Sequence, residues 1–176
     1  MCSSDLTPSD VVSGYEQAAR IVAELPGGPS VLFEGFWDGD FVFFCRQHDH
    51  RRRFILRGGK VLYNFASYRD VDFRSYVEEE RDVEKLLRKY GVRYVVIEDV
   101  DESRTRESGL LRSLLETAKF RLIARVPVGK VGRRRPLSGS LEIYEYLAGA
   151  PAERAGELEI ELPGVRRTVR ARLPEN

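Results

Sequence analysis

The fold class of this protein is decided by residues 79–99, which read EERDVEKLLRKYGVRYVVIED. The first half carries apolar residues at helical spacing, and Gly91 then ends the helix. The second half, from Val92 to Ile97, is the apolar run of a strand that is buried on both faces. Such strands belong to parallel sheets covered by helices, so this unit predicts an α/β fold. The apolar residues of the helix are Val83, Leu86, Leu87 and Tyr90.

Further elements extend this pattern in both directions along the chain. We expect a short, mostly parallel sheet with helices on both faces and antiparallel strands at its edge. The parallel strands are predicted near residues 31–37, 53–57 and 92–98, and an antiparallel hairpin at 120–128 and 141–147. Helices are predicted near 13–25, where Ser13 and Glu16 have capping-box spacing, near 41–47 and near 110–115. A short strand is predicted at 60–65.

The chain is organised as one body with a terminal hairpin. The α/β body covers residues 9–149, and a linker rich in Ala, Pro and Gly covers 150–156. Residues 157–174 are predicted to form a C-terminal β-hairpin. Its residues Leu158, Ile160 and Leu162 alternate with glutamates, so one face of the hairpin is expected to pack on the body.

Residues 1–8 are interpreted as a non-native leader. The first six, Met-Cys-Ser-Ser-Asp-Leu, are what the end of a widely used sequencing adapter encodes when it is read in frame. We therefore expect the natural protein to begin upstream. Because the leader has no apolar period, it should contribute nothing to the fold.

Composition restricts the function only loosely. With 176 residues and 42% hydrophobic residues, the chain can build one core without disulfides. Its formal net charge of +1 gives no field that would attract nucleic acid, so no nucleic-acid partner is expected. Cys2 and Cys45 lack the spacing of metal ligands. No apolar run approaches the roughly 20 residues that span a bilayer, so the chain as given is expected to be soluble.

The candidate ligand site lies where the predicted parallel strands end, because the loops at that edge gather ligands. Trp37 offers a flat surface for a sugar ring. Arg57 and Lys60 would hold a phosphate or another anion. The structural alternative is that Asp38 caps a helix, Arg57 pairs with Glu98, and Trp37 only packs.

Other local patterns do not predict a metal site or a catalytic triad. His48-Asp49-His50 has no partner cluster, so no metal site is expected. Glu34 joins Asp38, Glu98 and Asp99 as candidate acid/base groups at one crevice. No His, Ser or Cys is spaced to complete a nucleophilic triad, and surface carboxylates are the favoured reading. We predict no catalytic residue in this chain and no cofactor.

A set of short motifs in a fixed order resembles a known family. The motifs are Gly14-Tyr15-Glu16 with Ala18-Ala19, Val31-Leu32-Phe33, Asp38-Gly39 with Phe41, Arg57-Gly58 with Lys60, Leu86-Leu87, Tyr90 to Tyr94 with Glu98, Phe120-Arg121-Leu122, and Ile143-Tyr144-Glu145. Over residues 13–173 they resemble the carboxyl-terminal soluble domain of bacterial polytopic membrane glycosyltransferases, which are similar to dolichyl-phosphate-mannose protein mannosyltransferases.

The resemblance implies a parent enzyme with many transmembrane helices that uses polyprenyl-phosphate-linked sugars. This domain would follow the last of those helices, on the extracytoplasmic side of the bacterial cytoplasmic membrane. The family's catalytic carboxylate lies in a loop between early transmembrane helices, so no catalytic residue carries over to this chain. Expected partners are the missing transmembrane domain and a lipid-linked sugar or its acceptor. The alternative function is a free-standing α/β module that binds a small anion or a nucleotide.

Overall fold

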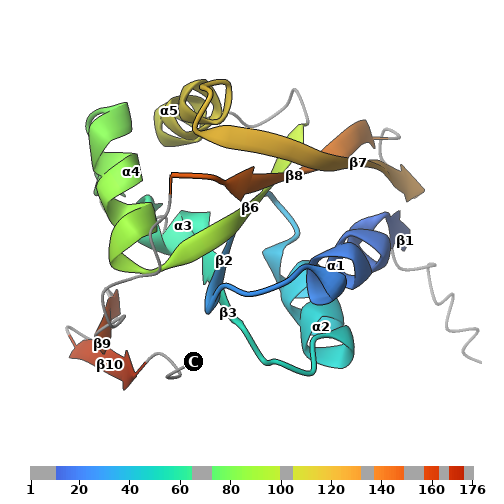
Figure 1. The fold of residues 1–176 in the computed structure, drawn as a ribbon, viewed down its shortest axis with the longest axis horizontal. Helices are drawn as coiled ribbons and strands as arrows, with labels where there is room; N and C mark the ends of the chain where they lie inside the picture. The colour runs from blue at the N-terminus through green and yellow to red at the C-terminus, as the bar shows by residue number, and fades with distance from the viewer. Residues whose placement is uncertain are drawn as a thin grey trace, which may run out of the picture.

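The computed structural model describes residues 11–64, 73–99, 105–131, 137–148, 157–162 and 167–172. The helices are α1 (Tyr15–Glu24), α2 (Asp38–His48), α3 (Gly58–Val61), α4 (Glu80–Lys89) and α5 (Arg106–Leu115). The strands are β1 (Val11–Ser13), β2 (Ser30–Glu34), β3 (Phe54–Arg57), β4 (Tyr63–Asn64), β5 (Arg74–Ser75), β6 (Val92–Asp99), β7 (Phe120–Val131), β8 (Leu137–Tyr146), β9 (Glu157–Leu162) and β10 (Arg167–Arg172). None of these described helices has the length and apolar character needed to cross a bilayer. The predicted α/β class is confirmed (Figure 1).

A mixed six-stranded sheet forms the centre of the molecule, in the order β1-β7-β8-β6-β2-β3. Strand β2 pairs in parallel with β3 and with β6, as predicted. Strand β8 is antiparallel to β6 and to β7, and β1 is antiparallel to β7. The sheet is therefore not mostly parallel, because the long hairpin β7–β8 and strand β1 make up half of its strands.

Helix α4 and strand β6 form as residues 79–99 predict. Helix α4 buries Val83 and Leu87 against the sheet. The chain then turns at Gly91, whose φ of 58° lies in the left-handed region that favours glycine. Strand β6 pairs with β2 on one side and β8 on the other, and its residues 94–97 are all buried. This central position explains why the strand is apolar on both faces.

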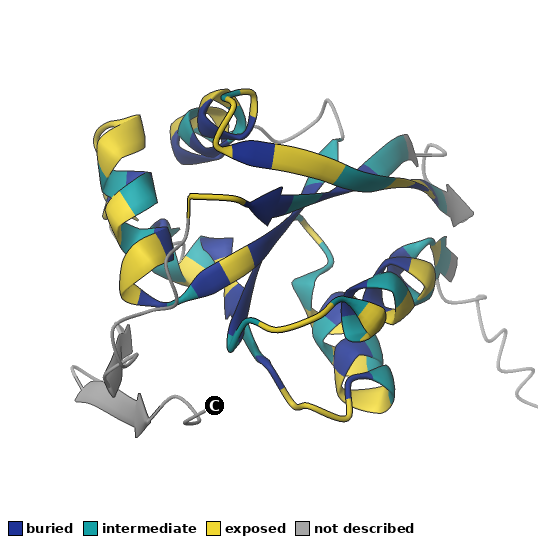
Figure 2. Ribbon diagram, viewed as in Figure 1, coloured by how far each residue is buried: buried dark blue, intermediate teal, exposed yellow. Residues whose placement is uncertain are grey.

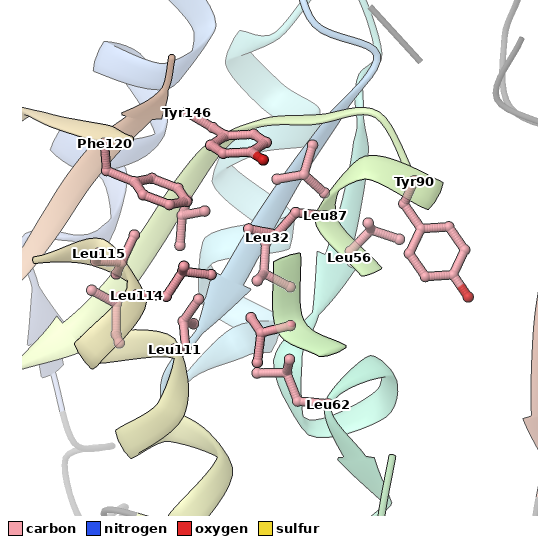
Figure 3. Close-up of a cluster of buried hydrophobic side chains, with 14 of the residues drawn as sticks. Leu32, Leu56, Leu62, Leu87, Tyr90, Leu111, Leu114, Leu115, Phe120 and Tyr146 are labelled. Carbon is pink, nitrogen blue, oxygen red and sulfur yellow. The ribbon is translucent and has the colours of Figure 1, made fainter. Parts of the chain in front are cut away.

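Helices cover both faces of the sheet (Figure 1). Helices α1 and α2 pack on one face, around a core that includes Phe33 and Phe41. Helices α4 and α5 pack on the other face, around Leu32 and Leu87 (Figure 3). Figure 2 shows buried residues along the central strands and on the helix faces that turn toward them.

The chain reverses its direction of travel across the sheet at β3. From β2 it passes through α2, on one face, to β3. From β3 it crosses back through α3 and α4, on the other face, to β6. The carboxyl ends of β2 and β6 therefore flank a topological switch point, which is the place where open α/β sheets usually bind ligands.

Two local predictions are wrong. Ser13 lies in β1 and donates its hydroxyl to the carbonyl oxygen of Gly129 at 3.2 Å, so it does not cap α1. Gly14 takes the cap position with a φ of 97°, and a Cβ there would lie 2.3 Å from the carbonyl oxygen of Pro127. The strand predicted at 60–65 is replaced by helix α3 and the two-residue strand β4, because the glycine pair 58–59 begins a helix.

The C-terminal hairpin is present as a separate two-stranded sheet, and β4 and β5 pair in another. Strands β9 and β10 are antiparallel, and their register sets Ile160 opposite Val169 and Glu159 opposite Arg170. The linker 150–156, the leader 1–8 and the side chains of the hairpin lie outside the described residues. The packing of the hairpin on the body therefore stays a prediction.

Candidate functional site

The predicted site residues lie at the edge of the sheet formed by the carboxyl ends of β2, β3 and β6. Trp37 is the N-cap and Asp38 the first residue of α2, which follows β2 after a short loop. Arg57 ends β3, and Lys60 lies in the short helix that follows. Glu98 is the second-last residue of β6. An ion pair joins the start of α2 to the end of β3, and a hydrogen bond joins β6 to the loop after β2.

Glu98 lies at the topological switch point between β2 and β6. Its carboxylate accepts a hydrogen bond from the Tyr15 hydroxyl at 2.7 Å and from the backbone N–H of Phe36 at 2.6 Å. The loop after β2 passes so close that a Cβ on Gly35 would lie 2.7 Å from Glu98 Oε2. Burial, followed by the hydrogen bond to Glu98, raises the pKa of Tyr15, so its hydroxyl remains a donor.

Asp38 and Arg57 neutralise each other. The guanidinium Nε of Arg57 forms an ion pair with the Asp38 carboxylate. Asp38 makes no side-chain cap, because Trp37 holds the N-cap position of α2 and no side-chain cap bond forms there. The Asp38 carboxylate still lies in the first turn, where the helix dipole favours a negative charge. Because the Arg57 side chain is 46% exposed, the pair adds little to stability.

Trp37 and Lys60 are the two remaining residues of the predicted site. Trp37 is half-buried, and its ring meets that of Phe36 edge to face at a centroid distance of 5.1 Å. Its inner side packs against the core beneath α1 and α2. Lys60 is exposed and forms no ion pair with a described residue. These two side chains can offer an apolar ring face and a positive charge at the same edge.

Glu34 is the buried acid of this edge. It ends β2 and is only 6% exposed. Its Oε1 accepts hydrogen bonds from Tyr63 Oη at 3.1 Å and from the Ser108 hydroxyl. Burial is the main cause that raises the pKa of Glu34, and the nearby carboxylate of Asp38 adds to it. A Cβ on Gly58 would lie 1.8 Å from Oε2, so the start of α3 lies against the carboxyl group.

Glu107 adds a second buried carboxylate to the same region. It lies in the first turn of α5, is 2% exposed, and its Oε2 has no hydrogen-bond partner among the described residues. Its charge also contributes to the raised pKa of Glu34. The helix start is capped by Thr105, whose Oγ1 accepts a hydrogen bond from the backbone N–H of Ser108 at 3.1 Å.

The chemistry of this edge is that of a buried acid among hydroxyl groups. Within the described ranges, no three His, Cys, Asp or Glu side chains gather in a way that could hold a metal ion. Cys45 lies in the core beneath α2, where burial raises the pKa of its thiol to about 12, so it is unsuited to act as a nucleophile. The carboxyl group of Glu34 is able to hold a proton, and the hydroxyl groups of Tyr63 and Ser108 orient this carboxyl group.

Sequence reasoning selected the correct strand ends but not every residue that meets there. It placed Glu34 at the crevice and then favoured the reading of a surface carboxylate, whereas the structure buries this residue. It did not select Tyr15, Tyr63 or Ser108. The position of Glu34 at the end of an apolar strand was the available signal. The hydroxyl partners arrive from elements 29 and 74 residues away in the chain, which leaves no local pattern.

Comparison of the chain with models of protein families, with curated proteins and with solved structures gives no match.

Proposed function

We propose that this chain is a non-catalytic, carboxyl-terminal domain of a membrane glycosyltransferase that uses polyprenyl-phosphate-linked sugars. The parent enzyme would lie in the bacterial cytoplasmic membrane, with this domain on the extracytoplasmic side. The ordered motifs between residues 13 and 173 support the family. One observation supports the accessory role: two carboxylates at the candidate edge are already occupied by contacts within the domain. Glu98 accepts hydrogen bonds from Tyr15 and from the Phe36 N–H, and Asp38 forms an ion pair with Arg57.

A contact with the substrate of the parent enzyme is compatible with this arrangement. Trp37 offers part of its ring to a sugar, and Lys60 offers a charge to a phosphate. Arg57 is held by Asp38, so it would meet an anion as one half of an ion pair and not as a free cation. In this role the domain positions a donor or acceptor whose reaction occurs in the membrane-embedded part.

The alternative, a free-standing module for a nucleotide or small anion, meets an obstacle at Glu98. In open α/β sheets a ligand phosphate binds backbone N–H groups at the switch point. Here the N–H of Phe36 already donates to the Glu98 carboxylate at 2.6 Å. A phosphate at that position would lie against this carboxylate, and like charges at short range repel.

The test uses the full-length parent enzyme that this proposal implies. Replacing Arg57 and Lys60 by Gln removes two charges at the candidate edge. A matched control replaces Arg81 and Lys85, two exposed residues of α4, by Gln. We expect reduced sugar transfer only for the first pair, with both variants folded.

Two results would contradict the proposal. Sugar transfer by the purified chain without its membrane part would show that the domain is itself catalytic. An upstream sequence without in-frame apolar segments of spanning length would show that this chain is not part of a membrane glycosyltransferase. Unchanged transfer in the Arg57/Lys60 variant would leave the accessory domain but end its role in substrate contact.

A further inference from the structure

Four aromatic side chains on α2 and on the loop that enters it are exposed or half-buried, in addition to the buried Phe41. Phe36 is 70% exposed and Phe43 is 64% exposed. Trp37 and Phe44 are half-buried and contact them, with centroid distances of 5.1 Å for Phe36–Trp37 and 5.4 Å for Phe43–Phe44. We call these four residues the α2 aromatic group. Two largely exposed phenylalanine rings within eight residues need a reason outside the core.

The core of the domain does not supply that reason. Helix α2 turns Phe41 and Cys45 toward the sheet. At 100° per residue, Phe43 lies about 200° around the helix from Phe41, which is the side opposite to the core. Phe36 precedes the helix and, with its exposed ring, adds nothing to the buried cluster. Both rings therefore face outward.

The charges near the aromatic group nearly cancel. Asp38 is paired with Arg57, and the remaining exposed charges of α2 are Asp40 and Arg46. A surface with exposed aromatic rings and little net charge is suited to the boundary between lipid head groups and acyl chains, where Trp concentrates and where Phe side chains on a protein surface insert. It is poorly suited to a partner that is recognised by charge.

The topology sets this group near the point where the chain enters the domain. Strand β1 leads through Gly14 into α1, and α1 packs along α2 on the same face of the sheet (Figure 1). The hydroxyl of Tyr15, the first residue of α1, and the backbone N–H of Phe36 both donate to the carboxylate of Glu98, at 2.7 Å and 2.6 Å. The entry point and the loop that carries Phe36 therefore lie close together. A membrane segment that precedes β1 would hold this face close to the bilayer.

We propose that the α2 aromatic group is a membrane-surface contact, with Phe36 and Phe43 inserted at the head-group level of the bilayer. This inference rests on the proposed function, which supplies the membrane segment before β1. Trp37 then lies at the water–lipid boundary beside the candidate edge. The contact would orient the carboxyl ends of β2, β3 and β6 toward the membrane-embedded half of the enzyme.

Trp37 makes the proposal directly measurable, because it is the single tryptophan of the chain. The full chain, carrying an N-terminal histidine tag, is attached to phosphatidylcholine vesicles that contain a nickel-chelating lipid. We expect a blue shift of the Trp37 emission and quenching by brominated phosphatidylcholine. Raising the salt concentration from 0.1 to 0.5 M should change neither signal, since the contact is apolar.

The decisive variant is Phe36→Ser with Phe43→Ser, which keeps Trp37 as the reporter. We expect the bromolipid quenching to fall at least threefold, while circular dichroism stays unchanged. The matched control is Leu122→Ser, which alters a 44% exposed side chain on β7. The Trp37 emission of this control should be quenched by the bromolipid as strongly as that of the parent chain.

Equal quenching in the double serine variant and the parent chain would overturn the proposal. So would a blue shift that appears without vesicles and grows with protein concentration, because a second copy would then cover the rings. Either result leaves the glycosyltransferase proposal standing, since that proposal is judged by sugar transfer in the parent enzyme and by its upstream sequence.

Discussion

Glu34 shows how a single residue can oppose the stability of the fold it belongs to. Its carboxyl group is buried beside Glu107 and Asp38, and no described cation pairs with it. The pKa is therefore raised in the folded state. Between the ordinary pKa of a glutamate and this raised value, the folded chain holds one more proton than the unfolded chain. The free energy of unfolding thus falls as the pH rises through that interval, and the loss persists above it.

Replacing Glu34 by Gln should remove this loss. The amide keeps the size and the acceptor oxygen for Tyr63 and Ser108, but carries no charge. We expect a higher melting temperature than that of the parent chain at pH 8 and a much smaller difference at pH 4. Thermal unfolding followed by circular dichroism across this range measures both. The matched control, Glu24→Gln on the exposed end of α1, should show no such trend; a melting temperature for Glu34→Gln below the parent at pH 8 would contradict the argument.

Gly58 is required by the space that Glu34 occupies. A Cβ at position 58 would lie 1.8 Å from Glu34 Oε2 and 3.2 Å from Glu34 Cβ. The carboxyl group of Glu34 is buried, so it cannot move into solvent to make room. We expect Gly58→Ala to lower the free energy of unfolding by about 1–3 kcal/mol, the usual cost of overpacking.

At Gly109 an alanine is expected to have the opposite effect on stability. It lies inside α5, and nothing lies within 4 Å of an added Cβ. Since alanine favours a helix interior, Gly109→Ala should raise the free energy of unfolding by roughly 0.5–1 kcal/mol. Urea unfolding of both variants gives the two signs, and a stabilising Gly58→Ala would show that the start of α3 yields easily.

At the scale of elements, the C-terminal hairpin is too short to be stable by itself. A two-stranded ribbon is at best marginally stable alone, so β9 and β10 need a surface to pack on. Their register sets Leu158 opposite Ala171 and Ile160 opposite Val169, and these pairs share one face. The alternate pairs, such as Glu159 with Arg170, share the other face.

Truncation after residue 149 should therefore destabilise the body or expose apolar surface. Burial of each large apolar side chain is worth roughly 1.5–3 kcal/mol, so the loss should appear as a lower melting temperature or as binding of the dye ANS. Ile160→Ser should reproduce part of this effect. Glu159→Gln, on the charged face, should not. An unchanged melting temperature after truncation would mean that the hairpin is independent of the body.

At the scale of the whole molecule, the described fold begins with β1, which closes one edge of the sheet. Strand β1 pairs with the far end of β7, and Ser13 adds its side-chain hydrogen bond to Gly129. Deletion of residues 1–8 should leave the melting temperature unchanged, because this segment lies before the strand. Deletion of residues 1–13 removes the strand and should lower the melting temperature by several degrees. A loss already in the shorter deletion would show that the leader belongs to the fold.

The sequence by itself determined the α/β class, the four longer helices α1, α2, α4 and α5, and the three parallel strands with their acidic and basic ends. These features follow from local patterns: the 3.6-residue period of α4, the glycine at position 91, and the apolar run of β6. The strand ends that form the candidate site were predictable for the same reason. Parallel strands that neighbour one another must end at one edge.

Only the tertiary structure decided which side chains at that edge are neutralised and which are buried. Glu98 meets Tyr15 across 83 residues, Arg57 meets Asp38 and not Glu98, and Ser108 reaches Glu34 across 74 residues. The sequence predicted the hairpin of β7 and β8, but only the fold showed that β8 pairs with β6 and that β1 pairs with β7, so that half of the strands are antiparallel. Such pairings depend on how distant elements pack, because a carboxylate's partner and its burial are set by whatever the completed fold brings against it, and no local period in the sequence records that contact.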